Sequence, residues 1–61
     1  MSETEISREW AAFYRASAKK YSMNALLAVY ENHGEKMLRK VLAELKLEDS
    51  AALVMDAAKN Q

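Results

Sequence analysis

Apolar residues recur every three or four positions along most of this chain, which is the spacing of an amphipathic helix. The stripe of the first segment consists of Ile6, Trp10, Phe13, Tyr14, Ser17 and Tyr21. Ser2 or Thr4 is a suitable N-cap for this helix, because its side-chain oxygen accepts a hydrogen bond from an unpaired amide of the first turn. We expect Lys19 and Lys20 to close the last turn, where the helix dipole favours cations.

The next helix is predicted to start within Tyr21–Asn24, because Ser22 and Asn24 favour N-cap positions over helix interiors. Its stripe consists of Met23, Leu26, Leu27 and Tyr30. It is predicted to end at residues 32–34, since Gly34 is the only glycine and stands where a C′ residue with a left-handed backbone belongs. This placement is the strongest stop signal in the chain.

A third helix follows directly, with a stripe that consists of Met37, Leu38, Val41, Leu42 and Leu45. Glu35 and Arg39 lie outside this stripe, at the spacing of a favourable i,i+4 ion pair. The caps of a last short helix are expected from Glu48, Asp49 and Ser50, and its apolar residues are Leu53, Val54 and Ala57. The pattern therefore predicts an all-α fold, a small three-helix bundle with a short fourth helix, as a single helical domain over residues 1–61.

Composition narrows the ways in which this fold is stabilised. The 61 residues include no cysteine and no proline, so disulfides and thiolate metal sites are excluded and hairpin turns are disfavoured. The burial of a core this small barely offsets the conformational entropy lost on folding. Chains of this length therefore usually need a disulfide, a bound metal, exceptional packing or a partner. We therefore expect a partner surface, matched to a second copy of the chain or to another protein.

A surplus of apolar residues supports the same expectation. Val29, Leu47 and Met55 lie off the tightest stripes, and the second helix is apolar on nearly every side from Ala25 to Tyr30. A helix that is apolar on all sides requires burial on all sides. Because a monomer of this size leaves some of that surface in contact with water, an exposed apolar patch is expected. The alternative is that short helices crossing at steep angles bury more surface than a helical wheel indicates.

The best candidates for the anchors of a protein interface are aromatic residues and methionine, because such side chains contribute a large share of binding energy. These residues are Trp10, Phe13, Tyr14, Tyr21, Met23 and Tyr30. Their helical spacing does not separate core positions from interface positions. The predicted function is a small non-enzymatic protein-binding module, such as an accessory or stabilising subunit, or a homo-oligomeric structural protein.

Nucleic-acid binding is a further alternative. Nine Lys and Arg balance nine Asp and Glu, which disfavours a globally basic binder. The cations nevertheless form two clusters, which are Arg15, Lys19 and Lys20, and Lys36, Arg39 and Lys40. If the first and third helices pack antiparallel, both clusters would face one side and meet a phosphate backbone. The simpler interpretation is that these cations occupy solvated helix faces.

We expect no catalytic, cofactor or metal site. The chain has no Gly-rich phosphate loop and no nucleophile elbow. Glu31, His33 and Glu35 are two residues apart and point to different sides of a helix, whereas metal ligands in bundles lie three or four apart. His33 is better placed as a cation at a helix end or as a turn residue. The acidic N-terminal segment and the lack of a long apolar stretch predict a cytoplasmic protein without a membrane span.

One stretch of the chain resembles a known family. The residues that carry the resemblance are the run Lys20-Tyr21-Ser22-Met23, an apolar segment, Glu31, and the pair Leu38-Arg39. This pattern is similar to the DNA polymerase III theta subunit family over roughly Trp10 to Glu44, although Asn24 stands where a proline is usual. The resemblance implies a small helical accessory protein without enzymatic activity, which docks on the proofreading exonuclease subunit of a replicase.

Overall fold

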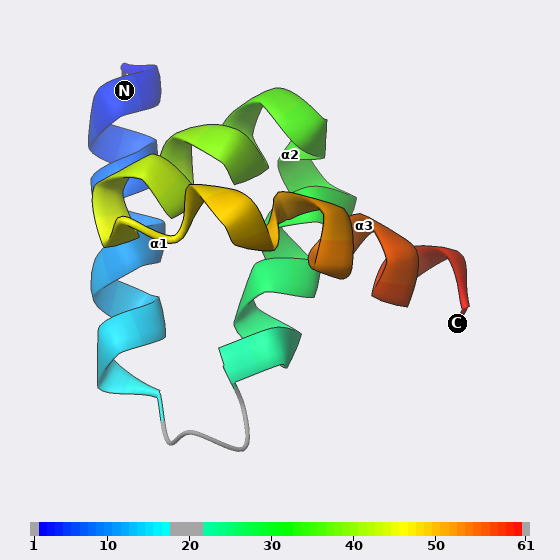
Figure 1. Ribbon diagram of the computed structural model, residues 1–61. Helices are drawn as coiled ribbons and strands as arrows, with labels where there is room; N and C mark the ends of the chain where they lie inside the picture. The colour runs from blue at the N-terminus through cyan, green and yellow to red at the C-terminus, as the bar shows by residue number, and fades with distance from the viewer. Residues whose placement is uncertain (1, 18–21, 61) are drawn as a thin grey trace.

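The computed structural model describes residues 2–17 and 22–60, and nearly all of them are helical (Figure 1). The elements are α1 (Glu3–Ala16), α2 (Ser22–Leu45), a 3-10 turn η2 (Glu48–Ser50) and α3 (Ala51–Lys59). The described part of the chain contains no strand, and the predicted all-α class is confirmed. The second and third predicted helices form the two halves of α2, and the predicted fourth helix is α3.

The start of α1 is determined by Ser2, one of the two predicted N-caps. Its hydroxyl oxygen accepts a hydrogen bond from the Glu5 amide at 3.2 Å, and its hydroxyl group lies 3.4 Å from the Glu5 carboxylate. The first of these contacts is the N-cap half of a capping box, and in the second the Ser2 hydroxyl donates to the Glu5 carboxylate. Glu3 and Glu5 occupy the first turn, where the helix dipole stabilises negative charge.

The end of α1 lies one turn earlier than the sequence pattern predicts. The helix ends at Ala16, and the Ser17 backbone is extended. The Ser17 amide and hydroxyl both donate to the Phe13 carbonyl, at 3.1 Å and 2.9 Å. Serine side chains compete with the backbone for such carbonyls, which makes serine less favourable in a helix interior than at a helix end. Arg15 is the cation in the last turn of α1. Lys19 and Lys20, which are expected to close the helix, lie outside the described residues.

Gly34 divides α2 into two halves, residues 22–33 and 35–45. Its φ of 85° and ψ of −177° belong to a backbone region that only glycine adopts at little cost. The predicted stop at Gly34 is confirmed, and α2 begins at Ser22, within the predicted boundary. In Figure 1 the first half runs alongside α1, and the second half turns back across it.

Lys46 redirects the chain at the end of α2. It has a left-handed backbone with a φ of 60°. The Leu47 amide donates to the Leu42 carbonyl at 2.8 Å, and the Lys46 amide donates to the Ala43 carbonyl at 3.2 Å. This pair of bonds is a Schellman motif. Leu47 then packs against the core, which fixes the direction in which η2 and α3 leave.

The residues expected to cap the last helix form a turn of their own. Glu48, Asp49 and Ser50 make up η2, and no side chain caps α3. The expected capping role is wrong because η2 runs directly into α3. Ser50 consequently has a helical backbone, with φ −85° and ψ −7°, in place of the extended one that an N-cap needs.

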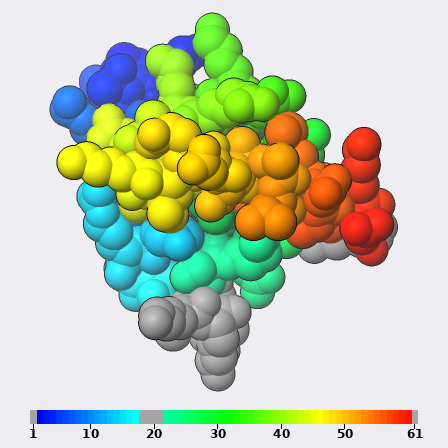
Figure 2. All heavy atoms as spheres, in the orientation of Figure 1, coloured from blue at the N-terminus to red at the C-terminus, as the bar shows by residue number. Residues whose placement is uncertain are grey.

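The first half of α2 lies at the centre of the fold. Within the described residues α1 and α3 each pack against α2 and have no contact with each other. Figure 2 shows the second half of α2, η2 and α3 as a continuous band over one face, with α1 at its side. The buried apolar residues are Ala11, Ala25, Leu26, Leu27, Val29, Met37, Leu38, Val41, Leu42, Ala51 and Val54.

This arrangement buries the residues that were expected to be surplus. Val29 is 1% exposed, and Leu47 and Met55 are partly buried against the core. The expectation that these side chains add to an exposed apolar surface is wrong for Val29, and Leu47 and Met55 each leave only part of the side chain at the surface. Helices on both sides of α2 cover its apolar circumference, so steep crossing inside one chain supplies the burial that the sequence pattern requires.

Three residues on the predicted inner stripes face solvent instead. Phe13 is 55% exposed, Met23 40% and Leu53 64%. In α1 the line that faces α2 contains the small residues Ser7 and Ala11, which are 3% and 1% exposed. Small side chains let two helices approach closely. Because Ser7 and Ala11 occupy the face of α1 that meets α2, Phe13 lies outside that face and is exposed.

Candidate partner-binding surface

Trp10 and Phe13 lie three residues apart on α1, next to the small-residue line that faces α2. Trp10 is half-buried and packs against the core, whereas most of the Phe13 ring is exposed. The two rings meet edge to face, with centroids 5.9 Å apart and planes at 77°. This geometry is favourable because the positive edge of one ring meets the negative face of the other.

These two rings and one carboxylate line a shallow hollow on the surface. Its lining residues are Glu9, Trp10 and Phe13, and we call it the aromatic hollow. Glu9 and Phe13 are four residues apart, so their side chains are neighbours on one side of α1. Within residues 2–17 and 22–60 Glu9 forms no ion pair. The hollow therefore combines an apolar aromatic surface with a negative charge.

His33 extends the aromatic surface on the other side of Trp10. Its ring lies edge to face with the indole, with centroids 5.9 Å apart and planes at 74°. The sequence places His33 at a helix end beside Gly34, which is where the structure has it. Its contact with Trp10 is not indicated by any local pattern, because the two residues are 23 positions apart and meet only through the packing of α1 on α2.

The aromatic hollow contains two of the six predicted anchors. Tyr14 and Tyr30 are half-buried and pack against the core, so they contribute to folding. Met23 is exposed on the first turn of α2, at the same end of the fold as the last turn of α1 (Figure 1). Tyr21 lies outside the described residues.

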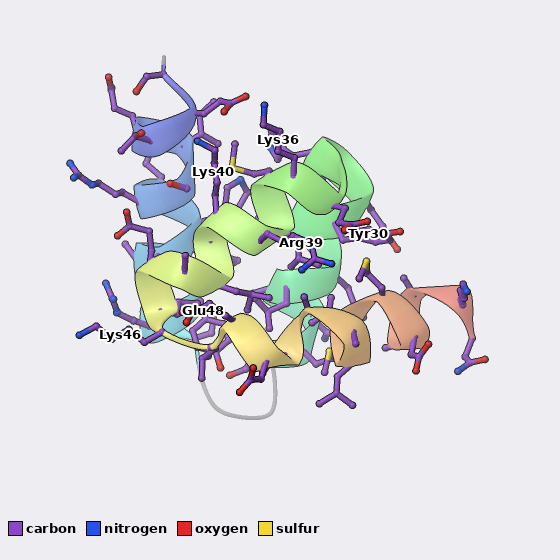
Figure 3. The ribbon with its side chains drawn as sticks, turned by 45° about the horizontal axis from the view of Figure 1, so that its top comes forward. Tyr30, Lys36, Arg39, Lys40, Lys46 and Glu48 are labelled. Atoms are coloured by element: carbon purple, nitrogen blue, oxygen red, sulfur yellow. The ribbon has the colours of Figure 1, made fainter. Side chains whose placement is uncertain are left out.

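Four of the six predicted cations have partners within the chain, and the other two, Lys19 and Lys20, lie outside the described residues. In Figure 3 Lys36 and Lys40 lie on the side of α2 next to the start of α1, and they approach the Glu3 carboxylate at 3.8 Å and 3.1 Å. Arg39 forms the predicted i,i+4 pair with Glu35, at 2.7 Å, which confirms that pair. These are exposed ion pairs, each of small energetic value.

Arg15 belongs to a different part of the surface. Its guanidinium donates to the backbone carbonyl of Glu44 at 3.1 Å, and Arg8 approaches the Glu44 carboxylate at 3.8 Å. The second half of α2 thus follows α1 in the same direction, from Glu3 toward Arg15. Arg15 lies roughly 18 Å along the helix axis from Glu3. The antiparallel packing on which a joint basic surface depended is therefore wrong, and Arg15 is separated from Lys36 and Lys40.

The Glu3 carboxyl at the start of α1 lies beside two lysines of α2. A hydrogen bond from Lys40 lowers the pKa of the Glu3 carboxyl, and the positive charges of Lys36 and Lys40 lower it further. The cause is that both lysines favour the charged form of the carboxylate. Because the pair is exposed, salt in the solvent screens this attraction.

Searches for a metal site, a membrane helix and related proteins give negative results. No group of three or more His, Asp or Glu side chains in the described residues is arranged to hold a metal ion. None of the helices in this part of the chain combines the length and the apolar character of a membrane span. Comparison with family models, curated proteins and solved structures finds no match for the chain.

Proposed function

We propose that this chain is a small non-enzymatic protein-binding module and that the aromatic hollow is its binding surface. The observation that supports this proposal is the exposure of Phe13. The chain buries Val29, Leu38 and other large apolar residues almost completely, yet leaves this ring 55% exposed. Aromatic side chains in exposed apolar patches are typical anchors of protein interfaces.

Phe13 is a better anchor than the other exposed apolar residues. Its ring is held against Trp10 by the edge-to-face contact, so less side-chain freedom is lost on binding. Leu53 lies on α3, which does not contact α1, and it lines no part of the aromatic hollow. Met23 is flexible and less exposed.

A narrower form of the proposal is an accessory subunit of the theta type, docked on a proofreading exonuclease. It rests on the sequence resemblance alone. Leu38 is buried in the core and Arg39 pairs with Glu35, so two residues that carry the resemblance already have roles within the fold. We therefore base the proposal on the aromatic hollow and regard such an exonuclease as the first partner to test.

The test compares partner capture by three forms of the chain: wild type, Phe13→Ala and Leu53→Ala. Both variants remove an exposed apolar side chain, so both are expected to keep the wild-type helicity in circular dichroism. Tagged forms are used to isolate bound proteins from lysate of the source cells, and a purified proofreading exonuclease is tested separately. We expect Phe13→Ala to reduce capture strongly and Leu53→Ala to leave it unchanged.

Equal capture by wild type and Phe13→Ala, with equal helicity, would overturn the proposal. Molar mass by light scattering, measured over a range of protein concentrations, identifies a second copy as the partner. If mass rises with concentration, and rises less in Phe13→Ala, the hollow binds another copy of the chain.

A further inference from the structure

We infer that the aromatic hollow takes the side chain of an arginine from a different protein. This inference rests on the proposed function, because it specifies the chemistry of the partner residue that enters the same surface. Three features of the described residues support it: the charge of Glu9, the ring faces of Trp10 and Phe13, and the engagement of the chain's own arginines.

The carboxylate of Glu9 gives the hollow its charge preference. Glu3, Glu35 and Glu44 each approach a cation within the chain, whereas Glu9 has no such neighbour in the part that the structure describes. An anion beside an apolar hollow disfavours a purely apolar guest and repels an acidic one. It favours a guest that has both an apolar stem and a positive end.

The aromatic rings favour arginine within that class. Tryptophan is the best side chain for cation–π contact, and a guanidinium is planar, so it stacks on a ring face and still donates to a carboxylate. Trp10 and Phe13 meet at 77°, so they present ring surfaces in two directions around the hollow. An arginine side chain can lie against one ring and direct its donors to Glu9.

The chain's own arginines are engaged elsewhere, which favours a different protein over a second copy. The three arginines of the sequence are Arg8, Arg15 and Arg39. Arg8 approaches the Glu44 carboxylate, Arg15 donates to the Glu44 carbonyl, and Arg39 pairs with Glu35. A second copy would give up one of these contacts to fill the hollow, which is a small cost for an exposed pair, whereas an arginine without such a partner gives up none.

The test uses N-acetyl-arginine amide as the probe and N-acetyl-citrulline amide as its neutral isostere. The indole N–H of Trp10 is the only tryptophan signal of the protein, and its position in a nitrogen–proton NMR spectrum is followed as each compound is added. We expect the arginine compound to move this signal saturably at millimolar concentrations and the citrulline compound to leave it in place. Glu9→Gln and Phe13→Ala are each expected to weaken binding about two- to fivefold.

Asp56→Asn is the matched control, since it removes one carboxylate from α3, which does not contact α1. It is expected to bind the arginine compound as the wild type does. Equal responses to the arginine and citrulline compounds, or no response to either, would overturn the inference. If the arginine compound fails while Phe13→Ala still abolishes partner capture, the proposed function stands without it. If the arginine compound binds but Phe13→Ala captures partners as well as the wild type does, the proposed function fails instead.

Discussion

The indole of Trp10 on α1 and the imidazole of His33 on α2 lie edge to face, with ring centroids 5.9 Å apart. Trp10 is the only tryptophan of the chain and His33 the only histidine. The tryptophan fluorescence of this protein therefore reports on one indole, whose aromatic neighbours are Phe13 and His33. The contact also connects the aromatic hollow to the bend at Gly34.

His33→Ala is expected to change the emission spectrum of Trp10, because it removes the imidazole that lies edge to face with the indole. The indole then meets more water, so its emission maximum should move to longer wavelength. Fluorescence at constant pH measures this shift, with Glu31→Ala as the control because Glu31 is exposed on the same helix. Identical spectra for the wild type and His33→Ala would show that the two rings are not in contact in solution.

Glu3 makes the stability of the fold sensitive to acid. Its pKa is lowered in the folded state by the hydrogen bond from Lys40 and the charge of Lys36, so folding favours the ionised form. The stabilisation is fully present above the pKa of the unfolded chain and is lost as the pH falls through the lower folded value. We expect Glu3→Gln to reduce the free energy of unfolding at neutral pH and to flatten its decline between neutral and acidic pH.

The measurement is urea unfolding at a series of pH values, at low and at high salt. Glu31→Gln is the control, because Glu31 is exposed and has no ion pair among the described residues. High salt should make the wild type resemble Glu3→Gln, since the interaction is screened. If both glutamine variants decline with acid as steeply as the wild type, the Glu3 interaction does not contribute.

Gly34 and Lys46 both have positive φ, and substitutions at them are expected to act in opposite directions. Gly34→Ala should lower the free energy of unfolding by about 1–2 kcal/mol, because only glycine tolerates this backbone region. No atom lies within 4 Å of where an added Cβ would sit, so backbone strain alone is responsible. Lys46→Gly should raise stability by about 0.5 kcal/mol, since relief of left-handed strain exceeds the added entropy of the unfolded chain.

Urea unfolding followed by circular dichroism measures both changes. The dependence of the free energy on urea concentration should be the same in all three proteins, which would show that the unfolded states are comparable. Equal destabilisation by the two substitutions would contradict the Schellman geometry assigned to Lys46.

Features that depend on a few neighbouring residues were predictable from the sequence. The cap at Ser2, the break at Gly34 and the Glu35–Arg39 pair each involve groups within four positions of one another. The end of α1 is also local, but the helical stripe includes Ser17 and so does not show that the helix ends at Ala16. The caps expected from Glu48 and its neighbours failed because η2 continues directly into α3.

The candidate site was only partly predictable. Trp10 and Phe13 were among the expected anchors, yet nothing in their spacing showed that Phe13 is exposed while Tyr14 packs against the core. The small residues Ser7 and Ala11 are the buried positions of α1, and the larger side chains lie beside them. A helical stripe defined by large apolar residues does not include these small buried positions.

By itself, the sequence determined that this protein is helical, where its central helix breaks and which groups stabilise the start of α1. These properties follow from backbone preferences and from side chains within one turn of each other. Tertiary structure alone decided that Val29 is buried, that Phe13 is exposed and that His33 meets Trp10. The reason is that burial depends on which helix covers each face, and that covering segment lies far away along the chain.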